Sequence, residues 1–153
     1  MELSYDGVCF DLFGTLVNPD GIAAEGAQEA LCLLPVDRWA IVTSCGGAYA
    51  RALLDQAGLI QPRFLVSSDA VARTKPAPDP YLAGARLLGL EPSRVIAVED
   101  SSDGIASARA GGMDVVAILR GRGLSFARAA SFQVERFADI QWRIIGSHLT
   151  LTI

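Results

Sequence analysis

The stretch Gly7-Val8-Cys9-Phe10-Asp11-Leu12 is a short apolar run that carries one acidic residue near its end. Continuous apolar runs of about four to eight residues predict strands that are buried on both faces, as in parallel sheets. Four more runs of this kind follow along the chain, at residues 39–43, 64–67, 94–98 and 114–119. We therefore expect these five segments to form the strands of one parallel sheet.

Alanine- and leucine-rich stretches with helical spacing separate these runs, at about residues 23–34, 48–57, 79–88 and 104–110. Pro78-Asp79-Pro80 is a typical helix start, and Gly111-Gly112 is a typical helix end. An alternation of strands and helices predicts right-handed βαβ units. The expected fold class is therefore α/β, with helices on both faces of the sheet.

Composition narrows the class of protein. A chain of 153 residues has room for one ordinary domain, and its 51% hydrophobic and 20% charged residues argue against disorder. The net charge of −4 disfavours a nucleic-acid or anionic-membrane partner. No apolar run approaches the roughly 20 residues that span a bilayer, and the first six residues lack a basic signal region. With three cysteines whose spacing fits no disulfide framework, these features predict a cytoplasmic protein.

The chain is expected to divide into a core domain, residues 1–140, and an apolar tail, residues 141–153. Two interpretations of the tail stay open. It could be an edge strand packed on the domain, or it could be a contact segment between copies of the chain in a homo-oligomer.

Polar side chains follow three of the predicted strands, where ligands bind in open parallel sheets. The first strand delivers Asp11, the second delivers Thr43-Ser44, and the fourth delivers Glu99-Asp100. Lys75, the only lysine, lies just ahead of the helix that starts at Pro78. We expect these side chains to meet at one edge of the sheet.

The charges at this edge do not balance, because Asp11, Glu99 and Asp100 outnumber Lys75. Buried carboxylates need a cation or must take up protons, and a set of ligands made only of oxygen suits Mg²⁺. Free backbone N–H groups near Gly14 and Gly46 would face phosphate oxygens. This pattern predicts Mg²⁺, a small phosphorylated substrate, and attack of Asp11 on phosphorus to give an aspartyl-phosphate that water cleaves.

Each of these residues also has a purely structural interpretation. Thr43-Ser44 could cap the following helix, Glu99-Asp100 could be a solvated strand end, and Lys75 could be a surface charge.

Four segments together resemble the haloacid dehalogenase (HAD) superfamily, whose members are mainly Mg²⁺-dependent phosphatases with a Rossmann-like core. They are residues 10–16 (FDLFGTL), 41–44 (IVTS), 75–81 (KPAPDPY) and 98–104 (VEDSSDG). The segments at residues 75–81 and 98–104 are most similar to the β-phosphoglucomutase and sugar-phosphatase branch. The resemblance covers about residues 5–140 and implies a three-layer sandwich with strand order 3-2-1-4-5, in which Asp11 follows the central strand.

The resemblance also implies a role for each site residue. Asp11 would be the nucleophile, and Lys75 would neutralise charge on the phosphoryl group that is transferred. The metal ligands implied are Asp11, the backbone carbonyl of Phe13, Glu99 (directly or through water) and Asp100. The residues implied to hold the phosphoryl oxygens are Gly14, Thr15, Thr43, Ser44 and Lys75.

Two features depart from the family pattern. Phosphatases of the family carry a second aspartate where this chain has Phe13, and such a general acid is worth about 10² to 10⁴ in rate. In addition, only about 26 residues separate Leu16 from Thr43, which is too few for the helical cap of this branch. The cap is therefore expected to be absent or vestigial, and the site open.

These observations leave three hypotheses for function. The first is an HAD-like phosphatase that hydrolyses small sugar-type phosphates with low selectivity. The second is a weak or inactive relative that binds a partner or a phosphorylated ligand, which Phe13 and the missing cap favour. The third is metal-free hydrolysis of a carbon–halogen type of bond, which Glu99-Asp100 argues against because that reaction needs no metal.

Overall fold

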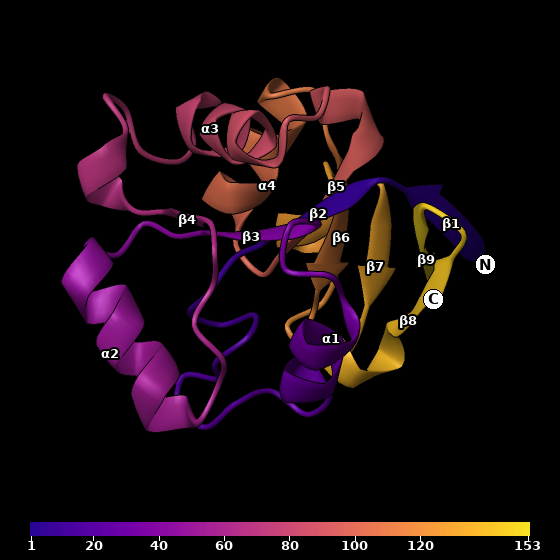
Figure 1. The fold of residues 1–153 in the computed structure, drawn as a ribbon, viewed down its shortest axis with the longest axis horizontal. Helices are drawn as coiled ribbons and strands as arrows, with labels where there is room; N and C mark the ends of the chain where they lie inside the picture. The colour runs from indigo at the N-terminus through magenta and orange to yellow at the C-terminus, as the bar shows by residue number, and fades with distance from the viewer.

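The computed structural model describes residues 1–153 and contains nine strands and four α-helices (Figure 1). The strands are β1 (Glu2–Tyr5), β2 (Gly7–Phe10), β3 (Trp39–Val42), β4 (Leu65–Val66), β5 (Val95–Glu99), β6 (Asp114–Ile118), β7 (Phe132–Val134), β8 (Gln141–Ile145) and β9 (His148–Thr152). The helices are α1 (Ala27–Leu33), α2 (Gly47–Ala57), α3 (Asp79–Leu88) and α4 (Ser102–Ala110). None of these helices combines the length and the apolar character that crossing a membrane requires.

Six strands form one parallel sheet in the order β4-β3-β2-β5-β6-β7. The five predicted strands are β2 to β6, and their order 3-2-1-4-5 is confirmed. The sixth strand, β7, extends the sheet beyond β6 and was not predicted. Its three residues, Phe132-Gln133-Val134, are too few and too mixed in polarity to stand out as an apolar run.

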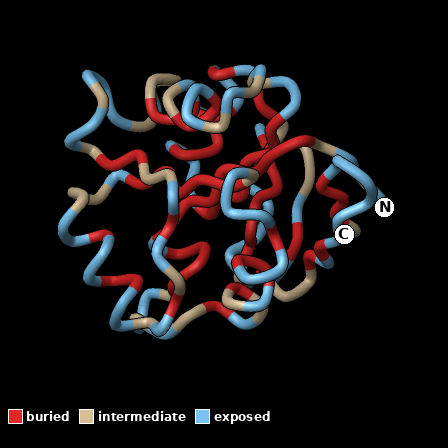
Figure 2. The backbone as a smooth tube through the Cα atoms, viewed as in Figure 1, coloured by how far each residue is buried: buried red, intermediate tan, exposed pale blue.

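Neighbouring residues of each strand point to opposite faces of the sheet, so each strand contributes to two separate cores. In β2, Phe10 belongs to the core covered by α1 and α2, whereas Cys9 belongs to the core covered by α3 and α4. Figure 1 shows α3 and α4 on one side of the sheet and α1 and α2 on the other, and Figure 2 shows the buried strands between them. The three-layer sandwich is therefore confirmed.

The tail forms two strands of a separate antiparallel sheet, β1-β9-β8, and adds no edge strand to the parallel sheet. Gly146, with φ of +60°, begins the two-residue turn of this hairpin, as Gly-Ser between two apolar runs commonly does. The ring of Trp142 lies 5.4 Å from that of Phe10, centroid to centroid, and Leu149 and Leu151 join the same core. The hairpin therefore packs on the domain and closes one end of its larger core.

No separate cap domain lies between β2 and β3. The segment holds a loop with two isolated β-bridges, at Val17 with Phe13 and Val17 with Ala23, followed by the seven-residue helix α1. The expectation of an absent or vestigial cap is confirmed, and the carboxyl edge of the sheet is left open.

Candidate active site

The predicted polar residues meet at the carboxyl edge of the sheet, around a cavity of about 400 Å³. Asp11 directly follows β2, Thr43 follows β3, and Asp100 follows β5. Lys75 comes from the loop before α3. The cavity is lined by Asp11, Phe13, Thr43, Ser44, Cys45, Lys75, Asp100, Ser101, Ser102 and Asp103.

Lys75 is the electrostatic centre of the site, and its side chain is only 4% exposed. Its Nζ donates to Asp11 Oδ1 at 2.8 Å, to Glu99 Oε1 at 2.6 Å and to the carbonyl oxygen of Val42 at 3.0 Å. Burial alone would lower the pKa of Lys75, but the carboxylates of Asp11 and Glu99 outweigh burial and raise the pKa above its usual value. Lys75 is therefore a charged, buried group, and the interpretation as a surface charge is wrong.

Glu99 is fully buried, and both of its carboxylate oxygens are already occupied. Oε1 accepts hydrogen bonds from Lys75 and from the hydroxyl of Tyr81 at 2.7 Å. Oε2 accepts from the backbone N–H of Asp100 at 3.0 Å and from the backbone N–H and hydroxyl of Ser101 at 3.3 and 3.2 Å. Burial and the nearby charge of Asp11 raise the pKa of Glu99. Glu99 thus anchors Lys75 and is not a solvated strand end, while its part in holding a metal, directly or through water, stays a prediction.

Asp11 and Asp100 both line the cavity, and each directly follows a strand of the parallel sheet. One oxygen from each of Asp11, Glu99 and Asp100 lies within 4.8 Å of the others. Burial raises the pKa of Asp11 and the charge of Asp100 adds to this effect, while Lys75 opposes it. Burial also raises the pKa of Asp100, and the charge of Glu99 adds to it. A divalent cation between Asp11 and Asp100 would relieve this repulsion, and donors that are all oxygen fit Mg²⁺.

Gly14 allows the backbone to pass directly beside the Asp100 carboxylate. Its φ is +90°, and a Cβ atom at this position would lie 2.2 Å from Asp100 Oδ2. Its backbone N–H donates to the carbonyl oxygen of Val17 at 2.6 Å. In this structure Gly14 therefore has no free N–H for a phosphate oxygen, and what it supplies is the close approach to Asp100.

Replacing Gly14 by alanine is expected to disrupt the site, and Gly21→Ala is the matched control. Gly21 also has a positive φ, +83°, but a Cβ atom added to Gly21 would have no neighbour within 4 Å. Gly21→Ala should therefore carry only the left-handed backbone cost of about 1 to 2 kcal/mol. Gly14→Ala should lose about 1 to 3 kcal/mol more through overpacking. Urea unfolding of both variants checks this, and equal losses would contradict the close approach.

The predicted phosphate-binding residues Thr15, Thr43 and Ser44 do not all line the same cavity. The hydroxyl of Thr15 donates to Asp11 Oδ2 at 3.0 Å, but Thr15 lines a neighbouring cavity and not the one that holds Lys75. The hydroxyl of Thr43 accepts from the backbone N–H of Cys45 at 3.1 Å. Thr43 and Ser44 do not cap α2, because the Asp69 carboxylate accepts the N–H of Gly47 at that helix end at 2.7 Å.

Phe13 lines the cavity beside Asp11, and the residue is 45% exposed. The position where the resemblance implies a second aspartate is therefore filled here by an exposed aromatic residue.

Sequence reasoning missed two groups of side chains that contact the acids. One is Tyr81, whose hydroxyl bonds Glu99. The other is the pair Arg120 and Arg122, whose Nη2 atoms lie 2.7 and 3.4 Å from Asp100 Oδ2. Both arginines follow the carboxyl end of β6. Their place after the fifth predicted strand is the sequence signal that could have found them.

A parallel sheet in this order, with acids and a lysine gathered at its carboxyl edge, defines a Rossmann-like α/β protein with its site at that edge. Within this class, a family model described as haloacid dehalogenase-like hydrolase matches residues 37–118. The chain belongs to that family, and the resemblance drawn from its four motifs is confirmed.

Curated relatives include sugar and polyol phosphatases. The chain is 48% identical over 80 residues to hexitol phosphatase A of Escherichia coli, which covers 52% of this chain and 37% of that protein. It is 31% identical over 132 residues to glycerol-1-phosphate phosphohydrolase 2 of Saccharomyces cerevisiae, which covers 82% of this chain and 49% of that protein. The chain thus spans half or less of the length of these two relatives.

Solved structures agree on the fold. A haloacid dehalogenase-like protein from Agrobacterium tumefaciens superposes with a TM-score of 0.68 at 30% identity, over 76% of this chain and 57% of that one. A hydrolase from Pseudomonas syringae superposes with a TM-score of 0.75 at 22% identity, over 87% of this chain and 94% of that one.

Proposed function

We propose that this protein is a Mg²⁺-dependent phosphomonoester hydrolase that acts through an aspartyl-phosphate on Asp11. The observation that carries the proposal is that Asp11, Asp100 and Lys75 line one open cavity, with the Lys75 ammonium 2.8 Å from Asp11 Oδ1. Small sugar-type phosphates are the proposed substrates, because relatives of this chain are named as phosphatases of a hexitol phosphate and of glycerol 1-phosphate.

In this mechanism the phosphoryl group of the substrate enters the cavity above Asp11. An Asp11 oxygen attacks phosphorus as the bond to the leaving oxygen breaks, and water then attacks the aspartyl-phosphate to release phosphate. The Lys75 ammonium, Thr43 and Ser44 line the same cavity, and in this mechanism they would stabilise negative charge on the phosphoryl oxygens. Mg²⁺, held by Asp11, the Phe13 carbonyl and Asp100, would supply further charge neutralisation. Glu99 holds Lys75 in place through its 2.6 Å contact.

Low selectivity follows from the open edge of the sheet. With only a loop and α1 between β2 and β3, no cap covers the cavity to exclude water or to contact the leaving group. We therefore expect turnover of several small phosphate esters with similar efficiency.

The proposal is tested by release of phosphate from p-nitrophenyl phosphate, with and without Mg²⁺. The wild-type protein should turn over only with Mg²⁺, and Asp11→Asn should abolish turnover because an amide is not a nucleophile here. Asp20→Asn, an exposed acid in the loop before α1, is the control and should retain full activity. Turnover by Asp11→Asn at the wild-type rate would refute the assigned nucleophile.

Phe13 favours a second candidate, a protein that binds phosphorylated ligands without turning them over. An aromatic ring beside Asp11 cannot donate a proton to the leaving oxygen. In this case calorimetry would show Mg²⁺-dependent binding of inorganic phosphate, while p-nitrophenyl phosphate would stay intact.

A further inference from the structure

Two arginines contact the Asp100 carboxylate, but only one of them is held firmly in place by other groups. Arg122 donates to the carbonyl oxygens of Asp100, Ile118 and Leu119 at 2.7, 3.1 and 3.1 Å. Its guanidinium also lies over the ring of Phe126, 4.4 Å from the centroid. Arg122 is therefore part of the framework of the loop after β6, and its contact with Asp100 Oδ2 is long, at 3.4 Å.

Arg120 has a different environment, since the Asp100 carboxylate is the one hydrogen-bonding partner of its side chain. The Nη2 atom lies 2.7 Å from Asp100 Oδ2, which is the length of a charge-assisted hydrogen bond. Arg120 is also the one residue other than glycine with a positive φ, +49°. Positive φ in a residue with a side chain is uncommon and is found where the surroundings require it. The backbone at this position thus turns the Arg120 side chain toward the proposed metal ligand.

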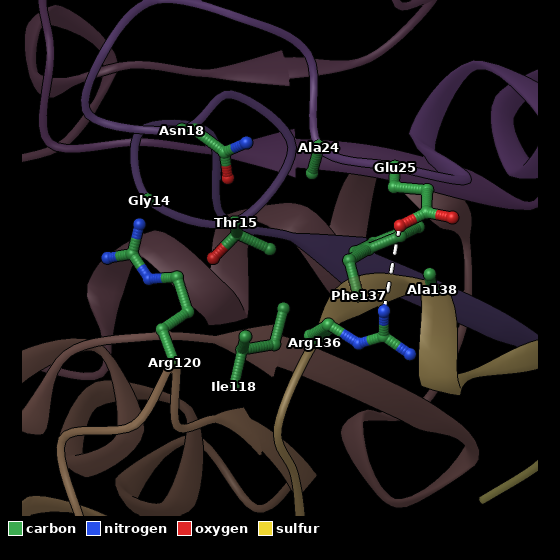
Figure 3. A pocket seen from close by; sticks show the side chains of 10 residues that line it. All are labelled: Gly14, Thr15, Asn18, Ala24, Glu25, Ile118, Arg120, Arg136, Phe137 and Ala138. Carbon is green, nitrogen blue, oxygen red and sulfur yellow. Dashed lines mark ion pairs between the residues drawn. The ribbon is translucent and has the colours of Figure 1, made fainter.

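A second cavity of about 170 Å³ is lined by Arg120 together with Gly14 and Thr15, and Lys75 does not line it (Figure 3). Figure 3 shows the Arg120 guanidinium near Gly14, while Arg136 lies further along the cavity and pairs with Glu25 at 3.7 Å. The side chain of Arg120 is 24% exposed and lines this cavity. The cavity gives the guanidinium room to withdraw from Asp100 without rearrangement of the sheet.

We propose that Arg120 is an exchangeable counter-ion that competes with the divalent metal for Asp100. This inference rests on the proposed function. Without metal, Arg120 neutralises a carboxylate that is crowded by Asp11 and Glu99. Asp100 would be one of the residues that hold Mg²⁺, an ion that usually keeps several of its waters when it is bound. A guanidinium on the same carboxylate then repels the metal and occupies space that those waters need, so Arg120 withdraws into the second cavity.

The consequence is a metal affinity lower than the carboxylates alone would give. Binding of metal and binding of Arg120 to Asp100 are coupled, and coupling of this kind commonly changes an affinity by roughly 5- to 150-fold. Arg120 thereby sets the Mg²⁺ concentration at which the site fills.

The test compares Arg120→Gln with Arg136→Gln by isothermal titration of Mg²⁺ into the metal-free protein. Arg136 lines the same second cavity but pairs with Asp139 and Glu25, and not with Asp100. We expect Arg120→Gln to lower the Kd for Mg²⁺ about tenfold, while Arg136→Gln leaves it unchanged. A Kd that is unchanged or raised in Arg120→Gln would overturn the proposal.

Thermal unfolding separates this role from a merely structural one. Arg120→Gln should lower the Tm of the metal-free protein, because Asp100 loses its counter-ion, and saturating Mg²⁺ should remove that deficit. An equal deficit in Tm with and without Mg²⁺ would show that Arg120 only supports the loop.

If neither the wild-type protein nor the variant binds Mg²⁺, both this inference and the metal dependence of the proposed reaction are refuted. If Arg120→Gln lowers the Kd for Mg²⁺ as expected but no phosphate ester is hydrolysed, only the proposed function is refuted.

Discussion

Replacing Lys75 by methionine is expected to destabilise the metal-free protein by about 3 to 5 kcal/mol, the usual cost of removing one partner from a buried ion pair. The reason is that Glu99, which is fully buried, and Asp11 both bond the Lys75 ammonium. Methionine fills a similar volume but leaves both carboxylates without their cation. The free energy of unfolding in urea at neutral pH measures the loss.

Arg73→Met is the matched control for this substitution, since it also removes a cation that is paired with an aspartate. Arg73 pairs with Asp79 at 2.8 Å, but its side chain is 70% exposed, so the loss of stability should be small. A loss in Lys75→Met no larger than in Arg73→Met would contradict the assignment of Lys75 as the centre of the site.

The contribution of Lys75 to the free energy of unfolding depends on pH, so the pH of the unfolding measurements must be chosen with care. The pKa of Lys75 is raised in the folded protein, so its contribution to stability is complete below the unfolded value of about 10.4. The contribution is lost only as the pH rises through the higher folded value. Stability differences measured between pH 7 and 8 therefore report the full effect.

Introducing an aspartate at Phe13 is expected to raise the turnover of alkyl phosphates by about 10² to 10⁴, the usual value of a positioned general acid. Phe13 lines the cavity with Asp11 and is 45% exposed, so a carboxyl group there reaches water and substrate without a large burial cost. Alkoxide leaving groups need protonation, whereas p-nitrophenolate leaves readily. The gain should therefore be large for glycerol 1-phosphate and small for p-nitrophenyl phosphate.

Phe13→Asn is the control, because it has nearly the shape of the aspartate but carries no acidic proton. If Asn raises alkyl-phosphate turnover as much as Asp, removal of the aromatic ring is the cause and proton donation is not. If neither variant gains activity, the position of residue 13 does not limit the reaction.

The strands of the sheet could be predicted from the sequence because burial on both faces requires apolar residues in each of them. The same logic placed Asp11, Glu99 and Asp100 at one edge, since parallel strands end together. It failed for β7, where a short edge strand with Gln133 at its centre needs little apolar character. For the tail the sequence pattern left two interpretations open, and the structure shows a turn at Gly146 with a strand on either side of it.

The contacts within the site were harder to predict than its residue types. The hydrogen bond to Glu99 Oε1 depends on Tyr81 reaching it from α3, 18 residues earlier in the chain. That Arg120 reaches Asp100 depends on a left-handed backbone angle after β6. Neither follows from a local pattern, because each depends on where two distant segments pack in three dimensions.

The hairpin β8–β9 has a consequence for how the chain is made. Phe10 shares its core with Trp142, Leu149 and Leu151, residues that leave the ribosome more than 130 positions later. Until they emerge, the growing polypeptide carries an uncovered apolar surface beside Phe10, the residue that precedes Asp11. A nascent chain stalled before residue 142 should therefore be a good substrate for chaperones that recognise exposed apolar segments.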